Sequence, residues 1–237
     1  MTDVTQLVLL TLLAGVSMPV GAAIAAAENI RPYWLENELR HGVIAFGGGA
    51  LLSAVALVLV PEGSEDLTTE WMAFFFFAGG IAFMALDEFL SRLKGSVSQL
   101  VAMLSDFIPE ALALGAAIAL GSSSAILLAG LMALQNLPEG FNSFRELKEA
   151  GTHTSRTIIL AFFGMSLMGP VAGLVGFYCL ADQPFTVSGI MLFAAGGILY
   201  IIFQDIAPQA KLEKRWAPSL GAVAGFLLGM IGHHLSH

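Results

Sequence analysis

Long apolar runs, separated by short polar connections, make up most of the chain. Eight of these runs are long enough to cross a bilayer as an α-helix, which needs about 20 residues. They lie near residues 5–27, 41–62, 70–90, 98–120, 123–144, 156–180, 185–207 and 216–235. Because the connections are short, the pattern predicts an all-α integral membrane protein with eight transmembrane helices, which forms a single transmembrane domain over residues 1–237.

The composition agrees with a protein that is surrounded by a lipid bilayer. Hydrophobic residues make up 57% of the 237 residues and charged residues only 12%, whereas about 25% is charged in an ordinary soluble domain. The net charge of −8 and the lack of a basic patch argue against nucleic acid as a partner. Cys179 is the single cysteine, which leaves no disulfide framework and no cysteine cluster for a metal. The first run follows Asp3 without a basic segment, so we expect a retained helix rather than a cleaved signal.

The basic residues fall on one side of the predicted bundle. All ten lie in or beside connections that join an odd-numbered run to the following even-numbered run: Arg31, Arg40, Arg92, Lys94, Arg145, Lys148, Arg156, Lys211, Lys214 and Arg215. Connections rich in Lys and Arg stay on the cytoplasmic side of a membrane. We therefore expect a multi-pass protein of the inner (plasma) membrane with both termini outside.

Two carboxylates lie well inside apolar runs. Glu110 and Glu139 belong to the fourth and fifth runs, and a charged residue such as Asp at the centre of a membrane helix costs about 2.5–3.5 kcal/mol on insertion scales. Asp106 and Gln135 stand four residues earlier, which places them on the same helix face as the glutamates. Asn136 adds a further oxygen beside Gln135.

A proline precedes each glutamate and strengthens the case for a site. Pro109 and Pro138 lack an N–H and leave a backbone carbonyl free four residues earlier, which is tolerated at membrane depth where a neighbour or an ion satisfies it. Two facing carboxylates repel unless they are protonated or bridged by a cation. A single Pro-Glu pair is more often structural, but two copies on consecutive runs favour a cation site. The predicted ligands are Asp106, Glu110, Gln135, Asn136 and Glu139.

Two further proline motifs indicate an internal repeat. The second run ends in Val60-Pro61-Glu62-Gly63 and the seventh in Ala207-Pro208-Gln209-Ala210, and the two runs point in opposite directions. Runs 1–3 and 6–8 would then be inverted repeats around runs 4 and 5, a 3+2+3 arrangement. Inverted repeats with interrupted helices and a site near the midplane are a transporter design.

The motifs resemble those of the ZIP (zinc/iron-regulated transporter-like) family of divalent metal transporters, in which the chain looks like a divergent, bacterial-type member. The similar segments cover nearly the whole chain: "GGGALLSAVALVLVPEG", "GGIAFMALDEFL", "DFIPEALALG", "QNLPEGFNSF", "SLMGPVAG" and "GGILYIIFQDIAPQA". The resemblance implies eight helices with both termini outside and a metal site on the fourth and fifth. It implies transport of a divalent cation such as Zn, Mn, Fe or Cd toward the cytoplasm, with the metal as substrate and no catalytic cofactor.

The departures from the family pattern bear on which metal is carried. Asp106 and Gln135 stand where the family has histidines, Phe107 where it has an asparagine, and Gly169 where it has a glutamate before the proline. These losses weaken a second metal position most and leave one all-oxygen site. Oxygen donors favour harder cations such as Mn²⁺ over Zn²⁺, although zinc also accepts carboxylates.

Three other polar residues are candidates for a release pathway. Asp87 lies near the inner end of the third run, where an ordinary solvated carboxylate is an equal alternative, and Gln204 and Asp205 lie in the inner half of the seventh. The runs contain no Ser-His pair or His-x-x-x-His motif, so no enzyme is expected. A metal-sensing or scaffolding membrane protein that keeps the fold without transport is the alternative function. The sequence leaves a homodimer open.

Overall fold

The computed structural model describes residues 3–28, 33–92, 96–122, 124–151, 153–180, 182–213 and 215–236. Every regular element in these ranges is helical, which confirms the predicted all-α class. The α-helices are α1 (Asp3–Ala27), α2 (Tyr33–Ala54), α3 (Val60–Gly63), α4 (Thr69–Arg92), α5 (Ser96–Ala119), α6 (Ala125–Glu149), α7 (Ser155–Ser166), α8 (Met168–Val175), α9 (Pro184–Ile201), α10 (Ala207–Ala210) and α11 (Leu220–Ser236). Three π-helical turns, η1 (Val55–Leu59), η2 (Gly176–Leu180) and η3 (Ile202–Ile206), and the short 3₁₀ turn η4 (Ala217–Ser219) join them.

Seven helical stretches of the described chain are long and apolar enough to cross a membrane. They are Asp3–Ala27, Asn37–Gly63, Thr69–Arg92, Leu100–Ala119, Ser155–Leu180, Pro184–Ala210 and Ala217–Leu235. The fifth predicted run, 123–144, corresponds to α6, which is 25 residues long but falls outside this set. Gln135, Asn136 and Glu139 in its middle lower its hydropathy, as does the polar and charged segment from Asn142 to Glu149. The molecule thus has the helices of a multi-pass membrane protein, and the least apolar of the long ones carries the predicted ligands Gln135, Asn136 and Glu139.

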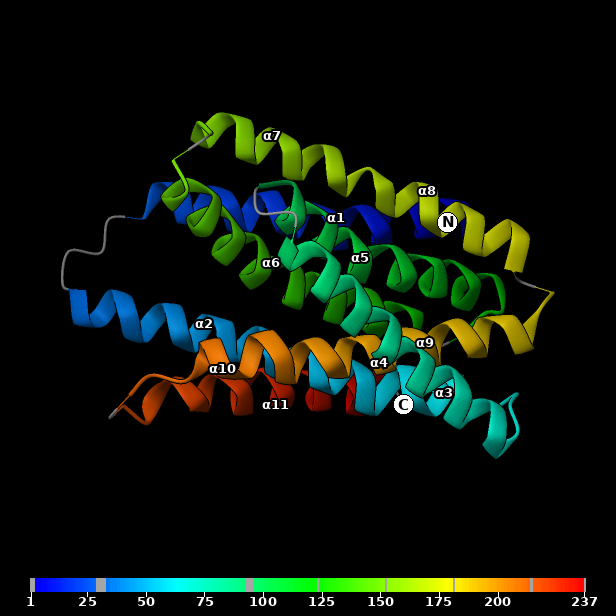
Figure 1. The fold of residues 1–237 in the computed structure, drawn as a ribbon. Helices are drawn as coiled ribbons and strands as arrows, with labels where there is room; N and C mark the ends of the chain where they lie inside the picture. The colour runs from blue at the N-terminus through cyan, green and yellow to red at the C-terminus, as the bar shows by residue number, and fades with distance from the viewer. Residues whose placement is uncertain are drawn as a thin grey trace.

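The helices form two groups. In one, α1 packs along α6, and α5 packs against α8 and η2, with α7 against α1. In the other, α2 packs along α11 and α4 along α9 (Figure 1). The groups meet mainly where α2 lies on α6 and α5 on α9. The two helices at the centre of the predicted 3+2+3 arrangement, α5 and α6, share the first group with α1, α7 and α8.

Small residues hold the paired helices at close range. A Cβ at Gly140 of α6 would lie 2.1 Å from the carbonyl oxygen of Met18 on α1, and a Cβ at Gly21 would lie 2.0 Å from that of Leu137. Neither position has room for a side chain, so the two backbones touch. This is the small-residue packing that membrane helices use in place of a hydrophobic driving force.

The two proline motifs that indicate a repeat have the same backbone geometry. A π-helical turn precedes each: η1 comes before Pro61, and η3 comes before Pro208. The N–H of Val60 bonds to the carbonyl of Val55, and the N–H of Ala207 bonds to that of Ile202, five residues back in both cases. Such π turns recur at functional sites within helices. Pro109 and Pro138, by contrast, lie inside the continuous helices α5 and α6.

The two ends of the bundle carry different charges. Both termini lie at one end, on the right of Figure 1. The opposite end holds the ion pairs that join neighbouring helices, in which Arg145 pairs with Glu28 and Arg215 Nη1 lies 3.1 Å from Glu38 Oε1. The basic residues whose positions are described gather at this second end, because α2, α7 and α11 begin there and α4 and α6 end there. We call it the basic end.

Candidate functional site

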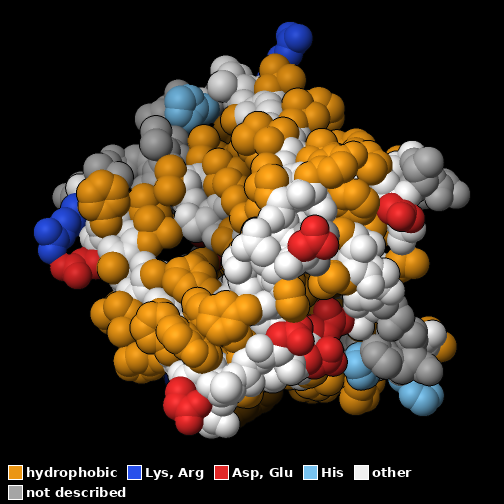
Figure 2. All heavy atoms as spheres, turned by 90° about the vertical axis from the view of Figure 1, so that its right-hand side faces the viewer, with side chains coloured by type: hydrophobic (Ala, Val, Ile, Leu, Met, Phe, Trp, Pro, Cys, Tyr) orange, Lys and Arg blue, Asp and Glu red, His pale blue; other side chains and the backbone are white. Residues whose placement is uncertain are grey.

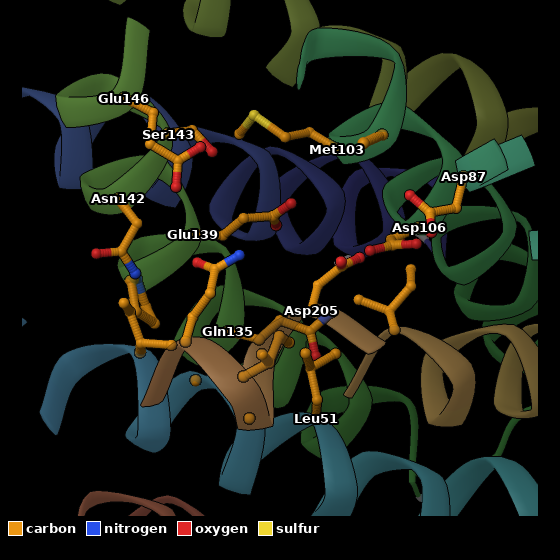
Figure 3. A pocket seen from close by; sticks show the side chains of 18 of the residues that line it. Leu51, Asp87, Met103, Asp106, Gln135, Glu139, Asn142, Ser143, Glu146 and Asp205 are labelled. Atoms are coloured by element: carbon orange, nitrogen blue, oxygen red, sulfur yellow. The ribbon is translucent and has the colours of Figure 1, made fainter. Parts of the chain in front are cut away.

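A cavity of about 330 Å³ lies between the two helix groups. Its wall is built by α2, α4, α5, α6, the end of α9, η3 and α10, and it extends from the middle of these helices toward the basic end (Figure 3). Five carboxylates line it, while Lys, Arg and His are absent from its described lining: the acidic residues are Asp87, Asp106, Glu139, Glu146 and Asp205. The rest of the wall is largely apolar. A wall of this kind attracts cations and repels anions.

The helix α6 contributes one stripe of polar residues to the cavity. Gln135, Glu139, Asn142 and Glu146 all line it, and their spacing of four, three and four residues keeps them on one face of a helix. Figure 3 shows Gln135 and Glu139 extending from α6 toward the side where Asp106 of α5 lies. The stripe leads from the middle of α6 to its basic end.

Glu110 does not line the cavity, although its spacing from Asp106 predicts that it shares that face. Its side chain is 0% exposed. The amide nitrogen of Gln135 donates to both carboxylate oxygens of Glu110, at 2.7 Å each. Charge-assisted hydrogen bonds of this kind are stronger than neutral ones. They tie α5 to α6.

The bond to Glu110 also fixes how Gln135 presents its amide. With the nitrogen turned to Glu110, the oxygen Oε1 is turned elsewhere, and it is buried without a hydrogen-bond partner among the described residues. The same holds for Oδ1 of Asp106 and Oδ1 of Asn142, and all three residues line the cavity. A buried oxygen without a partner costs about 1–3 kcal/mol. Three such oxygens therefore belong to residues around one cavity.

Asn136, the fifth predicted ligand, is turned away from the cavity. Its side-chain nitrogen donates to the carbonyl oxygen of Ala14 on α1, at 2.9 Å, and the residue is buried. The bond lies close to the contact of Gly140 with Met18 on the same pair of helices. In this structure Asn136 fastens α6 to α1.

The predicted release-pathway residues divide into two kinds. Asp87 and Asp205 both line the cavity, on α4 and η3. Asp87 Oδ2 accepts a hydrogen bond from the hydroxyl of Tyr200, at 3.1 Å, which links α4 to α9. Gln204 is exposed and lines a separate shallow surface pocket beside Tyr200 and Phe203. The sequence order of Gln204 and Asp205 thus puts only the second in the cavity, because neighbours on a helix differ by about 100° in direction.

Phe107 and Gly169 are in contact. Phe107 is 0% exposed, and a Cβ built on Gly169 would lie 2.6 Å from the Cζ atom of its ring. The ring therefore fills the room that a side chain at position 169 would need. The sequence shows these two residues as separate departures, and the structure shows them as one packed unit between α5 and α8.

A second hollow, of about 380 Å³, lies at the end of the bundle that holds the termini. Glu62, Glu65 and Asp66 line it, and the hydroxyl of Ser122 donates to Glu62 Oε1 at 3.4 Å. Figure 2 shows this end, where acidic side chains gather among hydrophobic ones. Among the described residues, the linings of this hollow and of the central cavity have none in common.

Sequence reasoning missed part of the wall. Asn142, Ser143 and Glu146 line the cavity, and their spacing from Gln135 and Glu139 was the available signal. Within the described residues no group of three or more His, Cys, Asp and Glu side chains is arranged to hold a metal ion. Of the five predicted ligands, three line the cavity: the two carboxylates Asp106 and Glu139 and the amide Gln135.

The fold and the cavity together define a class: a multi-pass helical membrane protein with an acidic cavity between two helix groups. No family model matches this chain. The chain is similar to the zinc transporter ZupT of Chlorobium phaeovibrioides, with 24% identity over 270 residues that cover 97% of this chain and 96% of that protein. The similarity is distant and extends over nearly the full length of both.

Proposed function

We propose that the protein is a ZIP-type transporter that carries a divalent metal cation through the central cavity toward the cytoplasm. One observation carries the proposal: the described lining holds five carboxylates and no basic side chain. Carboxylates crowded in a membrane interior need protons or a cation to balance them. The nearly full-length similarity to a protein named as a zinc transporter supports a metal cation in this role.

The proposed ligands are Asp106, Gln135 and Glu139, whose side chains line the cavity. Glu110 directs the oxygen of Gln135 through the two hydrogen bonds from its amide nitrogen, and it becomes a ligand itself when that amide turns away. The hydrogen bond from Asn136 to the carbonyl of Ala14 holds α6 against α1 and so supports the position of the ligands on α6. The donors are all oxygen, so the site should accept Mn²⁺ and Fe²⁺ readily while still admitting Zn²⁺ and Cd²⁺.

The structure fits a state that is open toward the cytoplasm and closed outside. A layer of buried apolar side chains separates the central cavity from the second hollow. It is formed by Leu114 on α5, Met132 on α6 and Ile198 on α9, each at most 1% exposed. Along each helix, this residue lies between those that line the cavity and those that line the hollow. This apolar layer blocks hydrated ions. Transport then requires a second state in which the layer parts and the inner mouth closes, as alternating access demands.

Four features support eight crossings with inverted repeats and both termini outside. With α6 counted as a crossing, the chain begins and ends on the same side, as Figure 1 shows. In the proposed repeats, α2 corresponds to α9, α11 to α4, α1 to α8, and α6 to α5. The packed pair α2–α11 should therefore have the counterpart α9–α4, and the pair α1–α6 the counterpart α8–α5. All four pairs occur. The π turns before Pro61 and Pro208 match. The basic end would face the cytoplasm of a plasma (inner) membrane.

A metal sensor or scaffold without transport is the second candidate. The packing of Phe107 against Gly169 favours it, because an apolar ring fills space beside the site. Such a protein would bind the metal and show no flux.

The test is uptake of Zn²⁺, Mn²⁺, Fe²⁺ and Cd²⁺ into vesicles that contain the purified protein. Binding and uptake that both fall in Glu139→Ala support transport through this cavity. Metal binding without flux in the wild type identifies a sensor or scaffold. Undiminished uptake in Glu110→Ala and Glu139→Ala would remove the cavity from the pathway. Light scattering on the same sample decides whether the protein is a homodimer.

A further inference from the structure

We propose that Asn142 is an additional metal ligand, which receives the cation one helical turn beyond Glu139 on the way to the basic end. The inference rests on the proposed function, because it adds a step to the same cavity. It concerns a residue that lies outside the Pro-Glu motifs and outside the five predicted ligands.

The position of Asn142 on α6 is the first argument. It lies seven residues after Gln135 and three after Glu139, and all three line the cavity. Residues at these spacings lie on one helix face. Figure 3 shows Asn142 beyond Glu139, in the direction of Glu146. A cation leaving Glu139 along α6 therefore meets Asn142 next.

The unpaired oxygen of Asn142 is the second argument. Its Oδ1 is buried and has no hydrogen-bond partner among the described residues. Nearly all buried polar atoms in proteins are paired, so an exception calls for a cause such as an ion. Because no donor holds Oδ1, the amide can turn about its last side-chain bond and present this oxygen to the cavity.

The cost of the residue is the third argument. Asparagine is a poorer helix former than alanine, and Asn142 lies in the interior of a 25-residue helix. It also buries an oxygen that nothing pairs. Alanine at this position would relieve both penalties. A residue that is unfavourable for the fold in two ways and faces an acidic cavity is best explained by a ligand.

A neutral amide is suited to this place. A cation bound only by carboxylates leaves slowly, whereas passage requires binding that is weak enough to release. Because the Asn142 oxygen is uncharged, it binds the metal weakly. The metal can therefore pass from Glu139 to Asn142 and then to the carboxylates that line the cavity nearer the basic end. As an oxygen donor it also favours Mn²⁺ over Zn²⁺.

The experiment compares Mn²⁺ and Zn²⁺ binding by equilibrium dialysis, and uptake into vesicles, for the full-length protein, for Glu139→Ala and for four further variants. Asn142→Ala removes the oxygen, Asn142→Asp keeps an oxygen donor, and Asn142→His introduces a nitrogen. Asn37→Ala, on α2 and outside the cavity lining, is the matched control. Thermal unfolding of each variant is recorded in the same detergent.

We expect Asn142→Ala to unfold at the wild-type temperature or above it. Even residues that only orient a metal ligand are worth about 10–100-fold in affinity, so its Mn²⁺ binding should weaken by at least about tenfold. Asn142→Asp should retain binding, Asn142→His should shift preference toward Zn²⁺, and Asn37→Ala should match the wild type.

Two results would overturn the inference while the proposed function stands. One is wild-type binding and uptake in Asn142→Ala alongside a loss of both in Glu139→Ala. The other is an equal loss in Asn142→Ala and Asn142→Asp, which would mean that the oxygen is not what matters. If the wild type binds no divalent cation, the proposed function itself fails and this inference falls with it.

Discussion

The helices α5 and α6 carry the same pattern, and the structure uses the two copies differently. Each has a polar residue, then a second residue, and then proline and glutamate: Asp106-Phe107-x-Pro109-Glu110 on α5 and Gln135-Asn136-x-Pro138-Glu139 on α6. Glu139 lines the cavity, while Glu110 is sealed from it and bound by Gln135. On α5 the polar residue that reaches the cavity is Asp106.

The spacing of two residues along a helix determines whether they share a face, but it does not determine what that face contacts in the folded protein. Glu110 lies four residues after Asp106 and Glu139 four after Gln135, so each pair shares a stripe. The cavity begins at the level of Asp106 and Gln135 and extends toward the basic end. Because α5 begins at the basic end and α6 ends there, four residues onward leads away from the cavity on α5 and into it on α6.

The largest expected effect separates the two glutamates. Glu139→Ala should reduce Mn²⁺ uptake to the level of empty vesicles, because it removes a carboxylate that faces the cavity, and should leave the protein folded. Glu110→Ala, unlike Glu139→Ala, should lower the thermal stability of the protein, because the side-chain nitrogen of Gln135 loses both of its acceptors. Uptake and thermal unfolding in detergent measure the two effects. Glu213→Ala, an exposed glutamate near the basic end, is the control; equal behaviour of the two variants would contradict the division of roles.

The next effect concerns Phe107, which has Asn136 as its counterpart on α6. Truncating a fully buried phenylalanine to alanine costs about 3–5 kcal/mol, so Phe107→Ala should unfold at a clearly lower temperature. Gly169→Ala should also destabilise, since the new Cβ would lie 2.6 Å from the ring. In the double variant the clash is absent. Its loss of stability should therefore be smaller than the sum of the losses in the two single variants. Additive losses in a double-mutant cycle would show that the two residues are not one packed unit.

The sequence predicts the class of fold well because apolar runs of membrane length leave few alternatives. The rule that residues spaced by four share a face places Gln135 and Glu139 together, and both line the cavity. The same rule places Glu110 with Asp106, and of these two only Asp106 lines the cavity. It does not predict that Asn136 bonds to Ala14 or that Gln204 points outward. Those outcomes depend on the rotation of each helix against its neighbours, which packing between small residues decides and a single helix pattern does not contain.

A smaller effect tests the bond that joins the two copies. Gln135→Leu leaves the Glu110 carboxylate without its donor and takes Oε1 from the cavity, and an unpaired buried group costs about 1–3 kcal/mol. Both thermal stability and Mn²⁺ affinity should fall. Gln135→Glu keeps an oxygen toward the cavity but places a second carboxylate against Glu110. The two carboxylates repel unless a proton or a cation neutralises them, so this variant should bind Mn²⁺ only in a neutralised state. Wild-type stability in Gln135→Leu would show that the bond to Glu110 contributes nothing.

The smallest effect is expected at Asn136, and it decides whether this residue is a ligand or a fastening. Asn136→Ala loses one hydrogen bond, to the carbonyl of Ala14, which is worth about 0.5–1.5 kcal/mol. If Asn136 only holds α6 on α1, the variant should unfold at a slightly lower temperature and bind Mn²⁺ with unchanged affinity. Asn136→Asp cannot donate to that carbonyl, so it should be no more stable than Asn136→Ala. A loss of affinity in Asn136→Ala that Asn136→Asp restores would return the residue to the ligand set, because only a ligand role is satisfied by the carboxylate.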